Sequence, residues 1–191
     1  MKEIRLHGRG GQGAAIAAEM LVAAMIKEGR YAVAFPMFGF ERRGAPLMAF
    51  VRFDDQPIRQ RTQVYTPDCL IITDPSLRHT EGIFQGLQPG GTLVINIAHP
   101  PTESLHPNLR VIGAVDGTGI ALHEMGKPIT NTCMLGAFAS ATGWLKLESL
   151  VSCFKDYFSG KLLENNLRCV ERGYRETKVI EFKEVADALK K

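Results

Sequence analysis

Short apolar runs alternate with helical stretches through the first two thirds of the chain. Six of these runs predict strands, at residues 3–6, 31–35, 47–53, 69–73, 92–97 and 109–114. The runs at 69–73 and 92–97 are almost continuously apolar, which is typical of strands covered on both faces. Helical patterns at 12–28 and 77–87 separate strands, and this alternation implies βαβ crossovers. The sequence therefore predicts an α/β fold, Rossmann-like, with a mainly parallel sheet and helices on both faces.

From Thr130 onward the pattern is helical. Residues 131–145 are rich in Ala and Gly, while 147–158 and 161–175 read as amphipathic helices that lead into a polar tail. The run at 47–53 follows a loop rather than a helix, so we expect it to pair antiparallel or at an edge of the sheet. No repeat or long linker divides the chain, so residues 1–191 are expected to form a single domain with a helical C-terminal segment.

A glycine-rich turn follows the first predicted strand and opens the first predicted helix. The spacing G-x-G-x-x-G is satisfied by a turn made of Gly8, Arg9, Gly10, Gly11, Gln12 and Gly13. Glycines at these places let the backbone turn sharply and let a phosphate, or another backbone, approach the amides at the helix N-terminus. All six residues are therefore candidates for binding a phosphate or for a protein contact.

The turn lacks the acidic partner that a dinucleotide site requires. Such a site has an acid about 20 residues beyond the glycines, at the end of the second strand, to hold the ribose hydroxyls. Here that strand runs into Pro36 and Met37, Glu28 precedes it, and the next acid, Glu41, is followed by two arginines. The sequence therefore argues against NAD binding.

The segment from Phe35 to Pro46 is rich in aromatic and basic residues for a connection between strands. It holds three Phe, one Met and two Arg in twelve positions. A large exposed apolar patch promotes association, and aromatic, Met and Arg residues are enriched in interface cores. One hypothesis is a loop folded over its own sheet edge. We favour a subunit contact beside the glycine turn, made by the candidate interface residues Phe35, Phe38, Phe40, Arg42 and Arg43.

Charge and hydropathy narrow the class of protein. The net charge is +3 on a chain that is 23% charged, and Lys and Arg form no long block, which disfavours nucleic-acid binding. No apolar run reaches the ~20 residues that span a bilayer. The first residues also lack the pattern of a signal peptide. We therefore expect a cytoplasmic protein without a membrane span.

The residue pattern indicates no redox or nucleophilic chemistry carried by this chain alone. The four cysteines form no C-x-x-C, so neither an iron–sulfur cluster nor a structural zinc is expected. The sequence contains no G-x-S-x-G elbow and no Walker-type phosphate loop. Of five histidines, only His7 lies near a predicted ligand site. We predict no catalytic residue and no metal ligand here.

Several stretches carry a family resemblance. They are the glycine turn, the strand and proline at 31–36, and the run from Glu41 to Arg52, followed by Pro67-Asp68, the Gly90-Gly91 turn and 131–137. Together they closely resemble the gamma subunit of 2-oxoacid:acceptor oxidoreductases, such as the pyruvate and 2-oxoisovalerate ferredoxin oxidoreductases. The similarity extends to about residue 145.

The resemblance implies an enzyme component that is inactive alone. The family decarboxylates a 2-oxoacid on thiamine diphosphate, passes electrons through iron–sulfur clusters to ferredoxin or a similar acceptor, and usually releases an acyl-CoA. Thiamine diphosphate, Mg and the clusters are then expected on partner subunits of the alpha, beta and delta type. The implied role of the gamma chain is assembly and the handling of CoA, with the glycine turn as a possible CoA site.

Two other interpretations stay open. A free-standing Rossmann-type nucleotide-binding oxidoreductase would bind NAD as an isolated chain. A non-catalytic assembly module would use the glycine turn only for protein contacts. The identity of the 2-oxoacid is also open, because the substrate pocket is expected on other chains.

Overall fold

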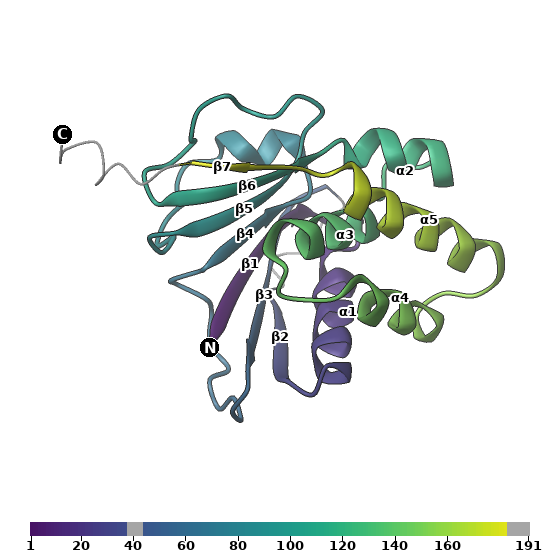
Figure 1. Ribbon diagram of the computed structural model, residues 1–191, viewed down its shortest axis with the longest axis horizontal. Helices are drawn as coiled ribbons and strands as arrows, with labels where there is room; N and C mark the ends of the chain where they lie inside the picture. The colour runs from purple at the N-terminus through teal and green to yellow at the C-terminus, as the bar shows by residue number, and fades with distance from the viewer. Residues whose placement is uncertain (38–43, 183–191) are drawn as a thin grey trace.

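The computed structural model describes residues 1–37 and 44–182 and contains a seven-stranded sheet covered by helices (Figure 1). The strands are β1 (Lys2–Arg9), β2 (Tyr31–Met37), β3 (Pro46–Asp54), β4 (Cys69–Ile72), β5 (Gly91–Asn96), β6 (Leu109–Val115) and β7 (Lys178–Glu181). The helices are α1 (Ala14–Lys27), α2 (Gly117–Met125), α3 (Asn131–Thr142), α4 (Leu147–Cys153) and α5 (Gly160–Glu176), with the short 3-10 helices η1 (Pro75–His79) and η2 (Phe154–Asp156).

The sheet is parallel in its centre and antiparallel toward both edges. Its strand order is β2-β3-β1-β4-β5-β6-β7. Strands β1, β4, β5 and β6 run parallel, whereas β3 is antiparallel to both β1 and β2, and β7 is antiparallel to β6. The predicted α/β fold class is confirmed, and so is the antiparallel pairing of the run at 47–53. This run lies inside the sheet, and β2 forms the edge.

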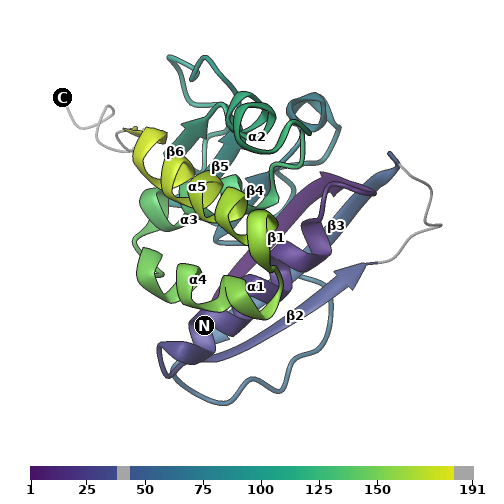
Figure 2. The same cartoon turned by 90° about the vertical axis from the view of Figure 1, so that its right-hand side faces the viewer.

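The two faces of the sheet are covered differently. On one face α1 and α3 pack against the strands, α4 packs against α1, and α5 lies outside α3 as a second helical layer (Figure 2). Every residue of α3 from Asn131 to Ala139 is buried. On the other face a separate apolar cluster joins β4, β5 and β6 to the connection that contains η1.

The prediction of a helix at 77–87 is wrong. The 3-10 helix η1 ends at His79, and turns follow as far as Gly86. Gly82 and Gly86 adopt φ angles of +73° and +76°, a left-handed conformation that cannot continue an α-helix. At Gly86 a Cβ atom would also overlap the carbonyl oxygen of Tyr65. This face is therefore covered by η1 and turns, while the α-helices gather on the opposite face, so the predicted helical cover of both faces is corrected to α-helices on one face.

Two elements had no clear signal in the sequence. Helix α2 begins with Gly117-Thr118-Gly119, a poor start for a helix, and the carboxylate of Asp116 accepts the amide of Gly119 at 2.8 Å to cap it. Strand β7 has only two apolar residues and lies in the predicted polar tail, where it pairs with β6. Contacts distant in the sequence, with α5 and with β6, stabilise these two elements.

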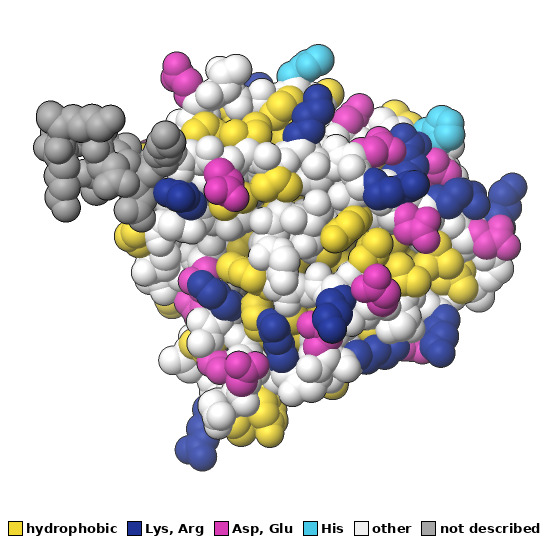
Figure 3. Space-filling view, viewed as in Figure 1, with side chains coloured by type: hydrophobic (Ala, Val, Ile, Leu, Met, Phe, Trp, Pro, Cys, Tyr) yellow, Lys and Arg dark blue, Asp and Glu magenta, His cyan; other side chains and the backbone are white. Residues whose placement is uncertain are grey.

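The surface carries mixed charge on the face seen in Figure 3. Basic and acidic side chains are interspersed there, and apolar side chains gather where α4 and α5 meet. Among the residues described, none of the helices combines the length and the apolar character needed to cross a membrane.

Candidate functional site

The glycine turn lies at the carboxyl ends of β1 and β4, where successive connections leave toward opposite faces of the sheet. After β1 the chain passes through the turn into α1 on the helical face. After β4 it passes through Asp74 into η1 on the other face. Open α/β sheets bind their ligands at such a switch point, so the position of the turn is that of a binding site.

The turn is tied to two distant segments. The amide of Gly10 donates to the carbonyl of Ala45 at 2.9 Å, and the amide of Gly44 donates to the carbonyl of Gly10 at 3.0 Å. Gly13, at φ +77°, begins α1, and a Cβ there would lie 2.5 Å from Nδ2 of Asn131. The predicted proximity between the turn and the segment that ends at Pro46 is thus confirmed for the described residues.

Two helix N-termini meet at this turn. The residues before α1 and α3, Gly13 and Thr130, cap neither helix with a side chain, but inside the first turn of α3 Oδ1 of Asn131 accepts the amide of Thr132 at 2.9 Å. The two helices are joined where Nδ2 of Asn131 donates to the carbonyl of Gly13 at 3.4 Å. Each N-terminus carries about half a positive charge from its aligned peptide dipoles, so the pair favours an anion.

Arg9 lies at the rim of the turn in a polar cluster. Its guanidinium donates to the carbonyl of Gly44 at 3.0 Å and to Oγ of Ser76 at 2.7 Å, and its Nε lies 3.3 Å from Oδ2 of Asp74. Gln12 donates to the same Asp74 oxygen at 2.8 Å. Burial alone raises the pKa of Asp74, but the hydrogen bonds from Ser76 and Gln12 and the charge of Arg9 outweigh it and lower this pKa. Arg9 therefore faces an ionised carboxylate while its side chain stays 33% exposed.

A buried polar layer beneath the turn escaped the sequence prediction. Asn96 is buried at the end of β5 and donates to the carbonyl of Thr73 at 2.8 Å and to Oγ1 of Thr118 at 2.9 Å. The hydroxyl of Thr130 also donates to Thr73, at 3.2 Å. The sequence signal for this layer was a polar residue where an apolar strand ends, as Thr73 directly after β4 and Asn96 at the end of β5. These groups satisfy one another and hold the strand ends in place.

The predicted site residues are only partly brought together. Gly8 and Arg9 end β1, and Gly10 to Gly13 form the turn, as expected. Phe35 is half-buried in β2, opposite Phe50. The other candidate interface residues lie outside the described residues; these are Phe38, Phe40, Arg42 and Arg43.

His7 does not face the turn. Its side chain lies on the sheet face away from α1, where its Nε2 accepts a hydrogen bond from Nε of Arg5 at 3.1 Å. Burial, and secondarily the positive charge of Arg5, lower the pKa of His7 to about 4. The imidazole is therefore neutral at physiological pH.

The cysteines are core residues. All four are buried and unpaired: Cys69, Cys133, Cys153 and Cys169. Burial raises the pKa of Cys69 and Cys133, and raises that of Cys169 to about 11. Protonated thiols are poor nucleophiles and poor metal ligands. Within residues 1–37 and 44–182, no group of three or more His, Cys, Asp and Glu side chains is placed to hold a metal ion.

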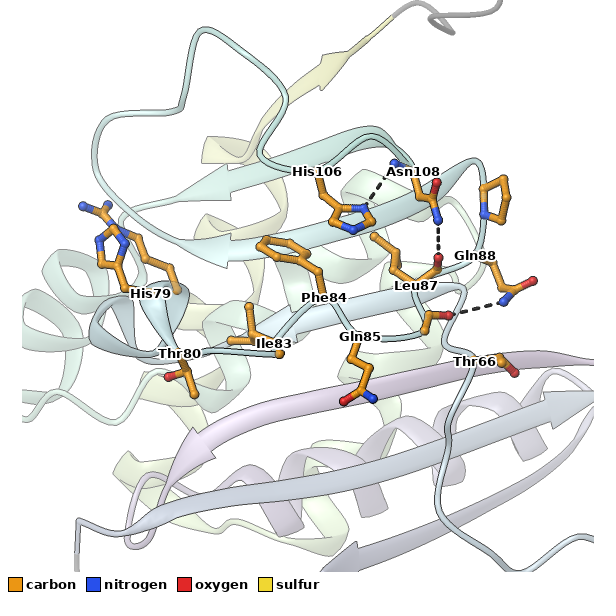
Figure 4. A pocket seen from close by; sticks show the side chains of 14 residues that line it. Thr66, His79, Thr80, Ile83, Phe84, Gln85, Leu87, Gln88, His106 and Asn108 are labelled. Carbon is orange, nitrogen blue, oxygen red and sulfur yellow. Dashed lines mark hydrogen bonds between the residues drawn. The ribbon is translucent and has the colours of Figure 1, made fainter.

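A separate hollow lies beside the turns that follow η1 (Figure 4). It has a volume of about 600 Å³, and the rings of Phe84 and His106 stack on its wall with centroids 5.3 Å apart. Asn108 donates its amide to Nδ1 of His106 at 3.1 Å and its Nδ2 to the carbonyl of Leu87 at 2.7 Å. These polar groups are used within the wall, so the hollow supports no particular chemistry.

The fold and the turn define a Rossmann-like α/β protein with a switch point that favours an anion. Comparison with known proteins identifies the family to which this protein belongs. Residues 3–176 match the family model described as pyruvate ferredoxin/flavodoxin oxidoreductase. The chain is 50% identical over 185 residues to the pyruvate/ketoisovalerate oxidoreductases common subunit gamma of Thermococcus kodakarensis, covering 95% of this chain and 100% of that protein. It is 49% identical over 181 residues to the NADH-dependent phenylglyoxylate dehydrogenase subunit gamma of Aromatoleum evansii, covering 94% and 95%.

A solved structure supports the same assignment. The crystal structure of pyruvate oxidoreductase subunit PORC from Thermotoga maritima matches with a TM-score of 0.82 and 37% identity, covering 94% of this chain and 98% of that one. This chain therefore belongs to the pyruvate ferredoxin/flavodoxin oxidoreductase family, as a gamma-type subunit of an oxidoreductase complex.

Proposed function

We propose that this chain serves a thiamine-diphosphate-dependent 2-oxoacid oxidoreductase by assembling with partner subunits and by binding the phosphate end of CoA at the glycine turn. Alpha, beta and delta type partners would carry thiamine diphosphate, Mg and the iron–sulfur clusters and would pass electrons to ferredoxin or a similar acceptor. The assembly role is supported by the names of the relatives, which are a common subunit gamma and a subunit PORC that this chain matches over nearly their whole length.

The names of the relatives support a role that is independent of the 2-oxoacid. The Thermococcus protein is named as a subunit common to pyruvate and ketoisovalerate oxidoreductases. The Aromatoleum protein is named for phenylglyoxylate and NADH, yet the two are 50% and 49% identical to this chain. We infer that partner chains select the 2-oxoacid and the electron acceptor, while the gamma chain supplies a step that these reactions share.

The observation that carries the CoA proposal is the meeting of two helix N-termini at the turn, of which that of α1 has no side-chain cap. The free amides at the start of α1 suit a phosphate. Bound CoA would supply the thiol that accepts the acyl group. Arg9 would hold a phosphate at the rim, and the backbone of 10–13 would let it approach. A NAD site is disfavoured, because antiparallel β3 occupies the place beside β1 where a dinucleotide fold has its second parallel strand.

Replacing Arg9 tests the proposal. In the assembled complex, Arg9→Ala is expected to raise the apparent KM for CoA about 10- to 100-fold, the effect of losing one charge-assisted contact. Decarboxylation measured with an artificial acceptor in the absence of CoA should change little. Steady-state kinetics with CoA varied at saturating 2-oxoacid give both values.

Asp74→Asn is the matched control, because it removes the carboxylate opposite Arg9 and leaves the guanidinium in place. If Arg9 binds a phosphate, this variant should keep or lower the KM for CoA. If Arg9 only holds the loop at Gly44 and Ser76, Arg9→Ala will lower stability without changing the dependence on CoA. That result would leave assembly as the function of the turn.

A further inference from the structure

A groove of about 560 Å³ lies on the face of β1 and β3 that points away from α1. Its floor contains Arg5 and His7 from β1 and Met48 and Phe50 from β3. Its walls come from the segments at 63–65 and 77–86 and are largely apolar. The groove is separate from the glycine turn, which opens at the carboxyl edge of the sheet.

Arg5 is fixed in the floor of this groove. Its side chain is buried, with the residue only 7% exposed, and its Nη2 donates to the carbonyls of Ile83 and Gln85 at 2.8 and 2.9 Å. Its Nε donates to His7. Within the described residues, Nη1 has no acceptor. In the same part of the chain, every side-chain nitrogen that is fully buried has a hydrogen-bond partner, so Nη1 is not fully buried. Nη1 is therefore a free donor that can be reached from the groove.

The positive charge of Arg5 has no carboxylate partner among the residues described. Arg52 provides the comparison, since it lies on the same face, is 2% exposed and donates to Oε1 of Glu3 at 2.6 Å. A buried charge is costly unless it is paired, and an arginine stays charged at all physiological pH values. Glu81 also lines the groove, but it is exposed at the rim and forms no ion pair with Arg5. The floor of the groove therefore presents a cation that fits an anion.

His7 adds a second donor to the floor. Since its Nε2 accepts from Arg5, the proton of the neutral ring is on Nδ1. A guanidinium nitrogen and an imidazole nitrogen on one strand face match the two oxygens of a carboxylate. Met48 and Phe50 would contact the apolar groups beside it.

The surroundings of the groove favour a protein occupant over a small molecule. Phe35 and Met37 of β2 pair with Phe50 and Met48 and therefore share their face of the sheet. Met37 is 40% exposed, and Tyr65 at the rim is 68% exposed. Among the strands that the structure describes, β2 is an edge, and no described strand pairs with its outer backbone groups. A small carboxylate would leave this apolar surface open, whereas a polypeptide would cover it.

We propose that this groove docks a segment of a partner subunit, in which a carboxylate flanked by apolar side chains pairs with Arg5. The inference rests on the proposed assembly of this chain with other subunits and is independent of CoA binding. It also gives Phe35, a candidate interface residue, a defined place at the edge of the docking surface.

The test compares two variants that differ only in charge. Met48 is the direct cross-strand neighbour of His7, so Met48→Glu would bring a carboxylate within reach of Arg5, while Met48→Gln would bring a neutral side chain of the same shape. Titration of the full chain with purified partner subunits of its complex should show association about 10- to 100-fold weaker for the Glu variant than for the Gln variant. Leu162→Glu, at an exposed position on α5, should assemble normally.

A second variant protects the test against misfolding of the first. Arg5→Gln should weaken association with the partner subunits by a similar factor. The association of this variant should also depend much less on salt concentration than that of the unmodified chain. Thermal unfolding checks that the variant is folded. Equal association of the Glu and Gln variants would overturn the proposal. So would binding of sodium acetate to the isolated chain that depends on Arg5 while assembly does not, because it would assign the groove to a small carboxylate. In either case an unchanged KM for CoA would leave the proposed role of the turn untouched.

Discussion

The isolated chain is expected to show no measurable oxidation of any 2-oxoacid, and added thiamine diphosphate with Mg²⁺ should not restore the activity. The reason is that, in the described part of the chain, no group of three or more His, Cys, Asp and Glu side chains is placed to hold a metal ion. The four cysteines are buried core thiols, and burial raises the pKa of Cys69 and Cys133 well above the ordinary value. His7 is neutral and hydrogen-bonded to Arg5.

The measurement is reduction of an artificial electron acceptor by the purified chain with pyruvate, a branched 2-oxoacid or an aryl 2-oxoacid. The preparation should also be colourless, since iron–sulfur clusters absorb visible light. Recombining the same preparation with its partner subunits is the positive control. Turnover by the rigorously purified chain would contradict its assignment as a dependent subunit.

Gly173→Ala is expected to lower the free energy of unfolding by about 3 kcal/mol, although the same change in an ordinary helix stabilises by about 1 kcal/mol. The sign reverses because α3 and α5 cross with their backbones in contact. A Cβ at Gly173 would overlap the carbonyl oxygen of Cys133, and a Cβ at Gly136 would overlap that of Val170. Backbone atoms cannot move aside as a flexible side chain can, so the helices would have to separate.

Urea unfolding of the isolated chain gives the free energy, with Glu171→Ala as the control. Glu171 is exposed on the same helix, so its replacement should change stability by no more than about 0.5 kcal/mol. If Gly173→Ala proves as stable as the unmodified chain, the close crossing of α3 and α5 is wrong.

The strands and the glycine turn could be predicted because their signals are local. The apolar runs at 69–73 and 92–97 mark β4 and β5 within one residue at each end. The spacing of the glycines from Gly8 to Gly13 requires a turn before a helix whatever surrounds it. The missing acid at the end of β2 argues against a dinucleotide, and this stays a prediction. Arg9 was correctly placed at the turn, but its pairing with Asp74 was not foreseen.

The errors fall where contacts between distant segments decide the conformation. The pattern at 77–87 has helical spacing, yet Gly82 and Gly86 turn the chain because it must pass close to Tyr65. Strand β7 is too polar and too short to be recognised, and it forms because β6 offers an open edge.

By itself the sequence determined an α/β fold, the glycine turn and the family, because periodicity and motif spacing depend on neighbours along the chain. Tertiary structure alone decided that β3 lies between β1 and β2, that two helix N-termini meet at the turn, and that Arg5 is buried with no carboxylate partner in residues 1–37 and 44–182. Each of these depends on which strands pair and on which side chains then share a face. Strand pairing depends on residues that are distant in the sequence. The alternation of side chains along a strand is the same for a neutral and for a charged residue, so it does not show whether a charge finds a partner. The uncompensated charge of Arg5 therefore becomes visible only when the surrounding segments are in place.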